Sequence, residues 1–399
     1  MTADAHTAPS ELARWRHHIH AHPELGFAEL QTSDFVAEKL LAFGVDELHR
    51  GIGGTGLVAV VRGKPGDRAI GLRADMDALP IHEDSDEAHT SQNPGVMHAC
   101  GHDGHTVMLL GAARELCATR NFAGTIYLVF QPAEEALGMA VPGSTHRDAG
   151  ALAMMRDGLF ARFPMEAIFG IHNRPGIAAG SFGIKPGVIY AAADRFEIRI
   201  VGKGCHAARP HLGIDPIMVS AQVIGALQTI SSRFFSPAEP VVVSVCEIMG
   251  GSAFNVIADD VRMVGTVRAL SEPARKQAEA LVHQITQGVA ASFGAQAEIN
   301  YQVGFPALIN DAALAEKARA VMVGLVGEAN VVDLEEPTMG GEDFACYLTE
   351  KPGCFVLVGN GTEGRHGLSV HNARYDFNDA VLPLGVRYWR ALAETLLPI

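Results

Sequence analysis

The chain has 399 residues, of which 48% are hydrophobic and 19% are charged. These values are typical of a globular protein and exclude a long disordered chain, while the length favours two domains over a single hydrophobic core. The formal net charge of −14, without any run rich in Lys and Arg, argues against binding to nucleic acid or to an anionic membrane.

The sequence favours a cytoplasmic protein. The N-terminal stretch lacks the basic flank and apolar segment of a signal peptide, and no apolar run reaches membrane-spanning length. The six cysteines are scattered and form no CxxC pair, which fits a reducing compartment better than a disulfide framework.

The first part of the chain alternates predicted helices and strands. Helices are expected over 11–22, 27–44 and 105–120, and strands over 57–63, 69–77, 125–132 and 167–173. Short apolar strands between helices predict a mostly buried sheet with helices on both faces. In such folds, ligand-binding groups gather at the carboxyl ends of the strands.

Near residue 187 the pattern changes to the order β-α-β-β-α-β, which predicts a ferredoxin-like unit. Its strands are expected over 194–202, 241–251, 261–270 and 296–303, and its helices over 215–234 and 272–293. Asp215 and Ser271 are expected to precede these helices, with Pro216 at the first helical position and Gly294 as a C-terminal cap.

After this unit, helices are predicted over 312–326, 342–350 and 379–397, with a strand over 354–360. The sequence therefore predicts an α/β fold. A mixed-sheet domain, formed by 1–186 and 303–399, is interrupted by a small α+β domain over 187–302.

The stretch MHACGHDGHT at 97–106 holds several potential metal ligands. In an extended segment, the i,i+2 spacing of Cys100 and His102 would put both side chains on one side. A thiolate and an imidazole suit Zn²⁺, and Mn²⁺, Co²⁺ or Ni²⁺ remain possible. Taken alone, this pair is equally compatible with an unligated Cys and His.

Other ligand types follow other predicted strands. The strand that begins at residue 125 leads into Glu134 and Glu135, whose adjacent charges repel each other unless a cation offsets them. His172 and His371 each follow a further strand, although a lone histidine there is usually structural, and a Glu pair alone is usually a solvated loop. Because four strand ends each supply a ligand type, the sequence favours a shared metal site over these separate explanations.

The remaining candidates have plainer interpretations. His17, His18, His20 and His22 are expected to be structural or surface residues. Asp75 and Asp77 are expected to orient a ligand, and His98 and His105 to lie behind the ligands or be structural. Cys205 and His206 could form a nucleophile pair, but adjacent residues rarely meet in a useful geometry.

Seven motifs, taken together, resemble the aminoacylase/hippurate-hydrolase family of metal-dependent amidohydrolases: MHACGHDGHT, RADMDALP, FQPAEE, GIHNRPG, GKGCHAARPH, MGGEDFACY and VHNARYDFND. Relatives of that family include indole-acetyl-amino-acid hydrolases and, more distantly, carboxypeptidase G-type enzymes. The motifs occur in family order from about residue 13 to the C-terminus. Gly170–Gly176, which read GxHNxPG, look more like hippurate hydrolases than plant indole-conjugate enzymes.

The resemblance implies two divalent metal ions per subunit, which are Mn²⁺, Zn²⁺, Co²⁺ or Ni²⁺. Carried over by motif, the ligands of these two ions would be Cys100, His102, Glu135, His172 and His371. Glu134 would act as the general base and then as the general acid.

The resemblance also assigns roles to the inserted domain. His206 would stabilise the tetrahedral intermediate and commonly reaches the site of a partner subunit, so 187–302 would be a lid and dimerisation domain of a homodimer or higher homo-oligomer. Asn255 and Arg268 are candidates for holding the substrate carboxylate, although Arg268 could equally be a surface residue.

The implied reaction is hydrolysis of the amide bond of a small N-acyl amino acid, hippurate-like or N-acetylated. A dipeptidase or an N-acetyl-diaminopimelate deacetylase would share most of these residues. Rival interpretations are a non-catalytic metal-binding protein and an amidase with Cys100 as nucleophile. The chain departs from the family pattern at Cys205, Ala258 and Gly341, where Gly or Ala, Pro and Ser are common; these departures concern the substrate pocket and lid.

Overall fold

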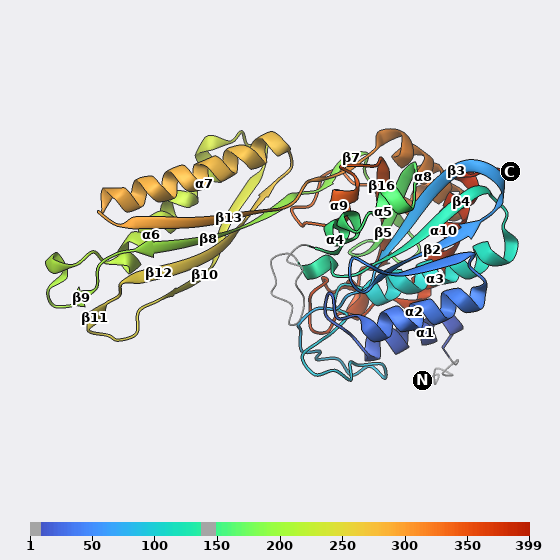
Figure 1. Cartoon of the computed structure of the whole chain (residues 1–399), viewed down its shortest axis with the longest axis horizontal. Coiled ribbons are helices and arrows are strands. Elements are labelled where there is room, and N and C mark those ends of the chain that lie inside the picture. The colour runs from blue at the N-terminus through green and yellow to red at the C-terminus, as the bar shows by residue number, and fades with distance from the viewer. Residues whose placement is uncertain (1–8, 137–148) are drawn as a thin grey trace. The chain divides into compact units, whose positions relative to one another are not determined.

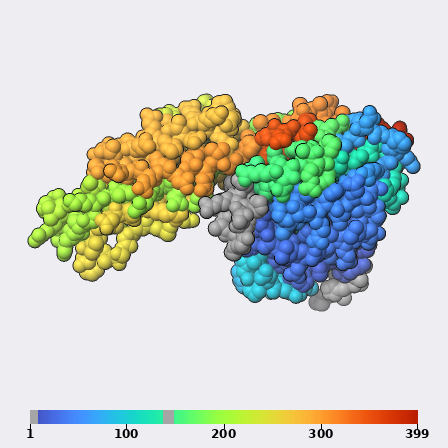
Figure 2. Space-filling model, viewed as in Figure 1, coloured from blue at the N-terminus to red at the C-terminus, as the bar shows by residue number. Residues whose placement is uncertain are grey.

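The computed structural model describes residues 9–136 and 149–399, which divide into two compact units (Figure 1). The first unit comprises the described residues of Met1–Gly187, Asn310–Glu335 and Cys346–Ile399, and the second comprises Val188–Ile309 and Glu336–Ala345. Segments from the beginning, middle and end of the sequence thus share the surface of the first unit (Figure 2).

The second unit has a different extent from the predicted insertion over 187–302. It runs on to Ile309 and also takes in Glu336–Ala345. That segment belongs to it because the Ala191 N–H lies 3.1 Å from the carbonyl oxygen of Thr338 and 3.0 Å from that of Gly340.

No described helix is long and apolar enough to cross a membrane. The N-terminal stretch, in which no signal peptide is expected, lies largely outside the described residues. The cytoplasmic location therefore stays a prediction.

The first unit is built on an eight-stranded mixed sheet. In spatial order its strands are β1 (Glu47–Ile52), β2 (Gly56–Arg62), β4 (Ala123–Gln131), β3 (Lys64–Asp75), β5 (Ala167–Pro175), β16 (Gly353–Gly361), β6 (Phe182–Ile184) and β15 (Val331–Asp333). The four strands β4, β3, β5 and β16 are parallel neighbours. Their carboxyl ends therefore meet at one edge of the sheet.

Helices cover both faces of this sheet, which confirms the predicted α/β class. One face packs against α1 (Glu11–Ala21), α2 (Leu30–Phe43), α3 (His102–Thr119), α8 (Ala312–Val326) and α10 (Leu382–Leu396). This core includes Leu72 of β3, Phe169 of β5 and Trp389 of α10. The segment with α4 (Gly150–Arg156) and α5 (Leu159–Arg162) covers the opposite face, where the ring centroids of Phe163 and Tyr127 lie 5.6 Å apart.

The second unit has the predicted ferredoxin-like order. Its elements are β8 (Ala192–Val201), α6 (Pro216–Leu227), β10 (Val241–Gly250), β12 (Asp260–Ala269), α7 (Glu272–Ser292) and β13 (Gln296–Phe305). The strands form an antiparallel sheet in the order β10-β12-β8-β13, and both helices contribute to its apolar core (Figure 1). From residue 194 to the end of β8, alternate residues are buried, and the residues between them are more exposed.

The expected helix caps are present in this unit. The Asp215 side chain accepts hydrogen bonds from the N–H groups of Ile217 and Met218, and Ser271 accepts one from Ala274. Gly294 follows α7 with a φ of +73°, which glycine adopts without strain.

Some predicted boundaries are wrong. The helix expected over 215–234 forms as α6 up to Leu227 and continues, after a turn, as the π-helix η3 (Ile230–Phe234). The helix expected over 342–350 is reduced to α9 (Phe344–Tyr347). Shorter strands were not expected: β7 (Gly187–Tyr190) pairs with β14 (Leu308–Asn310), and β9 (Cys205–His206) pairs with β11 (Val256–Ile257). These pairs are too short to show a hydrophobic period in the sequence.

Candidate metal centre

The candidate ligands of the first unit gather at the shared carboxyl edge of β4, β3, β5 and β16. Glu134 and Glu135 form the short helix η1 (Glu134–Ala136) just after β4, and His172 lies within β5. His371 follows β16 after a loop, and its N–H donates to the carbonyl of Ala99 at 2.7 Å. This bond joins the loop of His371 to the loop that carries Cys100.

A tight turn places Cys100 and His102. Gly101 has a φ of +93°, and a Cβ there would lie 2.2 Å from Nδ2 of Asn173 and 2.7 Å from the Tyr375 hydroxyl. His102 is the first residue of α3. The extended segment assumed from the i,i+2 spacing is therefore wrong, because this turn and not a strand brings the two side chains together.

Two site residues have an unusual backbone conformation. Ala133, directly before Glu134, has a φ of 54°, and His371 has a φ of 66°. Left-handed residues other than glycine are uncommon, and such strain persists where the surroundings hold it. The buried Glu29 holds Ala133 in this conformation, because its carboxylate accepts a hydrogen bond from the Ala133 N–H at 2.8 Å.

The five candidate ligands and Glu134 lie in three overlapping groups, within each of which the ligand atoms are all within 4.8 Å of one another. The groups are Cys100 with His102 and His172, Cys100 with Glu135 and His371, and His102 with Glu134 and Glu135. Cys100 Sγ lies 3.3 Å from His172 Nε2, and His371 Nε2 lies 2.9 Å from Glu135 Oε1.

The histidine rings are oriented to present their Nε2 atoms. His172 donates from Nδ1 to the carbonyl of Asn173 at 2.6 Å, and His102 Nδ1 lies 3.1 Å from Asp77 Oδ1. A carbonyl and a carboxylate only accept, so each Nδ1 holds a proton, and each Nε2 is the atom that can bind a metal ion once it carries no proton. His102 Nε2 is buried without a hydrogen-bond partner in the described chain, as a metal-ligand atom would be.

Acidic groups lie behind the histidines. Asp77 also accepts the N–H of Glu135 at 3.0 Å, so one carboxylate positions both the His102 ring and the η1 backbone. Asp75 lies 2.7 Å from His105 Nδ1 and accepts from Arg73 at 2.6 Å. Asp77 thus occupies the orienting position expected for it, whereas Asp75 hydrogen-bonds His105, which lies behind the candidate ligands.

The charges around the site favour bound cations. Burial and the neighbouring Glu135 and Glu134 raise the pKa of the Cys100 thiol. Burial alone would lower the pKa of His102, but Asp75 and Asp77 outweigh it and raise the pKa to about 10. Metal ions would replace these protons as the positive charges that the carboxylates require.

The remaining candidates lie in the second unit. His206 on β9 and Asn255 just before β11 are exposed and line one cavity of about 360 Å³ together with Cys205. Arg268 is near the far end of β12, about 26 Å along the strand from Asp260, which directly follows the β9–β11 region. The structure therefore does not bring Asn255 and Arg268 together within one chain.

Arg268 lacks an ion-pair partner among the described residues. Its guanidinium donates to the hydroxyl of Thr266 and to the carbonyl of Val267, which are neutral acceptors. The side chain is half-buried, and burial lowers its pKa. A half-buried, unneutralised guanidinium favours binding of an anion over a plain surface role.

Sequence patterns missed several residues that support the site. Glu29, Arg16, Asn173 and Tyr375 are all buried and hydrogen-bonded around the ligand-bearing loops. Glu29 and Arg16 lie in predicted helices, where a charged residue normally faces solvent. The supporting roles of Glu29 and Arg16 become visible only from their burial in the structure, because no local sequence signal indicates them.

The fold and the site together define a class of two-domain metal-dependent hydrolases. The family model described as peptidase family M20/M25/M40 matches residues 71–395, and the chain belongs to this family. The hippurate hydrolase of Campylobacter jejuni is 39% identical over 383 residues, which cover 96% of each chain. An N-acetyl-L-cysteine deacetylase of Bacillus subtilis is 40% identical over 367 residues, which cover 90% of this chain and 82% of that protein.

Solved structures agree with this assignment. The YXEP protein of Bacillus subtilis, described as a dinuclear metal-binding peptidase of the M20 family, matches with a TM-score of 0.80 and 33% identity over 97% of each chain. A putative aminohydrolase from methicillin-resistant Staphylococcus aureus matches with a TM-score of 0.84 and 31% identity, over 97% of this chain and 96% of that chain. The resemblance inferred from the motifs is confirmed, and the chain is an enzyme of this hydrolase class.

Proposed function

We propose that this protein hydrolyses the amide bond of N-acyl amino acids, hippurate-like or N-acetylated, and releases a carboxylic acid and a free amino acid. The observation that carries the proposal is the position of Glu134 beside His102 and Glu135, which puts a proton-transfer group next to metal-ligand atoms. Relatives named hippurate hydrolase and N-acetyl-L-cysteine deacetylase support this substrate class.

Two divalent metal ions are the proposed cofactors, held by Cys100, His102, Glu135, His172 and His371. The overlapping ligand groups and the dinuclear relative support two ions, and the mixed donor set suits Mn²⁺, Zn²⁺, Co²⁺ or Ni²⁺. When bound, such ions supply Lewis acidity, which polarises a carbonyl and lowers the pKa of an attacking water.

The side chains then divide the proton chemistry and the charge stabilisation. Glu134 accepts the proton of the attacking water and passes it to the leaving amine. His206 donates to the developing oxyanion, a contribution that is typically about 3–4 kcal/mol for a preorganised donor. Asn255 and Arg268 hold the substrate carboxylate, for which Arg268 has a guanidinium that pairs with no carboxylate among the residues the structure describes.

A homodimer is proposed as the working form. Asn255 lies just before β11, close to the start of β12, and Arg268 lies near the other end of β12, so both can contact one substrate only if two copies of the second unit supply them. The edge strand β10 also carries apolar side chains on the outside: Ile248 is 53% exposed and Met249 is 49% exposed. An unpaired edge with exposed apolar residues supports pairing with a second copy.

The rival interpretations are less well supported. A cysteine nucleophile needs a thiolate, but Cys100 is buried and its pKa is raised. A purely metal-binding protein would have no use for Glu134 beside its ligands. A dipeptidase or an N-acetyl-diaminopimelate deacetylase would use the same centre, and would differ in the acyl and carboxylate pockets.

Chelation should abolish hydrolysis, and metal ions should restore it. The assay panel is N-benzoyl-, N-acetyl- and N-indoleacetyl-amino acids together with dipeptides, each tested after chelation and after addition of Mn²⁺, Zn²⁺ or Co²⁺. The best substrate identifies the acyl preference and separates an aminoacylase from a dipeptidase. Activity that survives complete metal removal but is lost on thiol alkylation would instead support the Cys100 nucleophile.

Metal affinity should fall as the pH falls. The metal-free protein holds a proton on Cys100, whose pKa is raised, and on His102, whose pKa is about 10, so a bound ion has to displace both. We expect about a ten-fold loss of affinity per pH unit for each displaced proton. Calorimetric Zn²⁺ titrations in buffers of different ionisation enthalpy count these protons, and Cys100→Ser should release about one fewer. An affinity that does not change between about pH 6 and 8 would contradict the proposed ligand set.

A further inference from the structure

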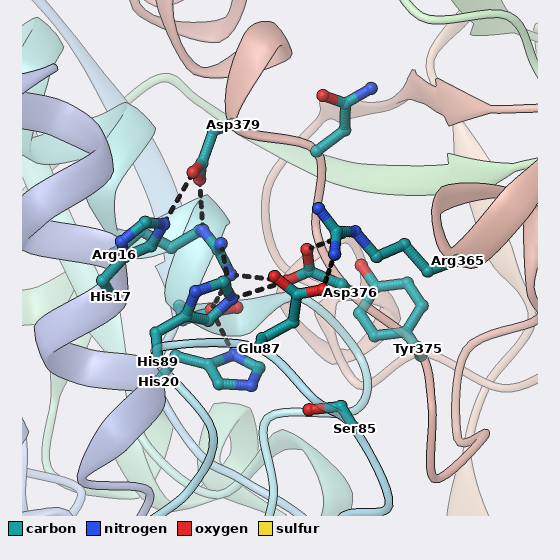
Figure 3. A network of polar contacts seen from close by, with 12 residues as sticks. Arg16, His17, His20, Ser85, Glu87, His89, Arg365, Tyr375, Asp376 and Asp379 are labelled. Carbon is teal, nitrogen blue, oxygen red and sulfur yellow. Dashed lines mark hydrogen bonds and ion pairs between the residues drawn. The ribbon is translucent and has the colours of Figure 1, made fainter. Parts of the chain in front are cut away.

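A buried arginine of α1 lies at the centre of a network of polar contacts (Figure 3). The Arg16 side chain is fully buried and contacts four other side chains. It donates to Asp103 Oδ2 at 3.2 Å and to Asp376 Oδ1 at 3.0 Å, lies 3.0 Å from His89 Nε2, and pairs with Asp379. One guanidinium therefore joins segments that are far apart in the sequence.

Two of these segments carry candidate metal ligands. Asp103 directly follows His102 in the first turn of α3, and Asp376 follows His371 in the loop after β16. Neither aspartate belongs to the three groups of candidate ligands described above. Arg16 is thus placed to set the distance between the backbone of His102 and the backbone of His371 without touching either ring.

A second connection leads from the same loop to Cys100. Tyr375, next to Asp376, donates its hydroxyl proton to Asn173 Oδ1 at 2.7 Å. The Nδ2 group of Asn173 donates to the carbonyl of Cys100 at 2.6 Å. The position of the loop therefore also fixes the backbone of a third candidate ligand.

The network itself is not a second metal site. Glu87, His89 and Asp376 offer ligand atoms close together, but arginines already neutralise both carboxylates. Arg365 pairs with Glu87 and with Asp376, and Arg16 also pairs with Asp376. Burial would raise the pKa of Asp376, but His89 and Arg16 outweigh it and lower the pKa to about 2, so this carboxylate is charged and paired.

We infer that Arg16 is a positioning residue that holds His102 and His371 at the spacing that metal binding requires. The inference rests on the proposed function, because it takes both histidines as metal ligands. Arginine is suited to this task because its planar fork can bind several carboxylates at once, whereas a lysine offers one point charge.

The test measures Co²⁺ binding by Arg16→Met, with calorimetry for affinity and visible absorption for ligand geometry. We expect an affinity loss of about 10–100-fold, as is typical when a group behind the ligands is removed, together with an altered Co²⁺ spectrum. Arg14→Met is the matched control, because Arg14 is exposed on the same helix and should leave Co²⁺ binding unchanged.

A general loss of stability has to be separated from a loss of positioning. Ile19→Ala removes a core side chain that is 2% exposed from the same helix and leaves the ion pairs in place. Wild-type Co²⁺ affinity in folded Ile19→Ala, with weakened affinity in Arg16→Met, supports positioning. An equal loss in both variants overturns it.

Asp376→Asn, which keeps the shape of the side chain, is measured in parallel and carries the test if Arg16→Met does not fold. Weakened Co²⁺ binding by this variant supports the inference. Wild-type binding and spectrum in folded Arg16→Met, or in folded Asp376→Asn, overturns the inference alone. A wild-type protein that binds no Co²⁺ overturns the proposed function and the inference with it.

Discussion

Replacement of Glu134 by glutamine should remove most amide hydrolysis while the metal ions stay bound. Glutamine keeps the size of the side chain but cannot take the proton of the attacking water, and a general base typically contributes about 10²–10⁴-fold to the rate. The measurement is kcat on the best N-acyl amino acid, together with metal content by elemental analysis.

Two control variants sharpen this comparison. Glu135→Gln, at the adjacent position, should instead lose metal, because Glu135 lies with Cys100 and His371 in a ligand group. Glu166→Gln, at an exposed ion pair with Arg68, should change neither quantity. Near-normal turnover by Glu134→Gln would exclude Glu134 as the base.

Replacement of His206 by alanine should lower kcat by about 10²–10³-fold without a change in metal content, as expected when one oxyanion donor is lost. His206 is exposed on β9 of the second unit, and its Nδ1 accepts a hydrogen bond from the Ala208 N–H at 3.1 Å. The ring proton therefore lies on Nε2, which can donate a hydrogen bond to the oxyanion. The exposed His211 supplies the matched control variant, His211→Ala, which should keep full activity.

A mixture of two inactive proteins tests whether the site is shared between subunits. Heterodimers of His206→Ala and Glu134→Gln should recover activity that neither parent has, because one site then combines an intact Glu134 with an intact His206. Verified heterodimers without activity would show that His206 acts within its own subunit or has no role in the reaction.

Local sequence patterns were enough to predict much of the fold and the candidate ligands. The apolar strands before Glu134, His172 and His371 were recognisable, and parallel strands bring their carboxyl ends together regardless of the loops. The ferredoxin-like order of the second unit was recognisable because its helices have clear caps at Asp215 and Ser271.

The sequence could not predict what depends on burial or on distant contacts. The geometry of Cys100 and His102 rests on the left-handed Gly101, whereas the i,i+2 spacing alone predicts an extended segment there. Arg16 and Glu29 have partners far away in the chain, so their roles leave no periodic signal. The distance between Asn255 and Arg268 likewise depends on the length of β12 and on the unexpected β9–β11 pair.

The place of β16 in the sheet has a consequence for how the enzyme is made. β16 lies between β5 and β6, although the whole of β8–β13 is translated between β6 and β16. A growing chain can therefore close its second unit, whose sheet is contiguous in sequence, while the larger sheet still lacks a central strand. β6 first gains β15 as a neighbour, and residues up to Gly361 must be made before β16 fills the place between β5 and β6. His371 is synthesised later still. With His371 as a proposed ligand, the metal centre stays incomplete until this residue has been synthesised, so we expect full metal loading only after all strands of the larger sheet have been made.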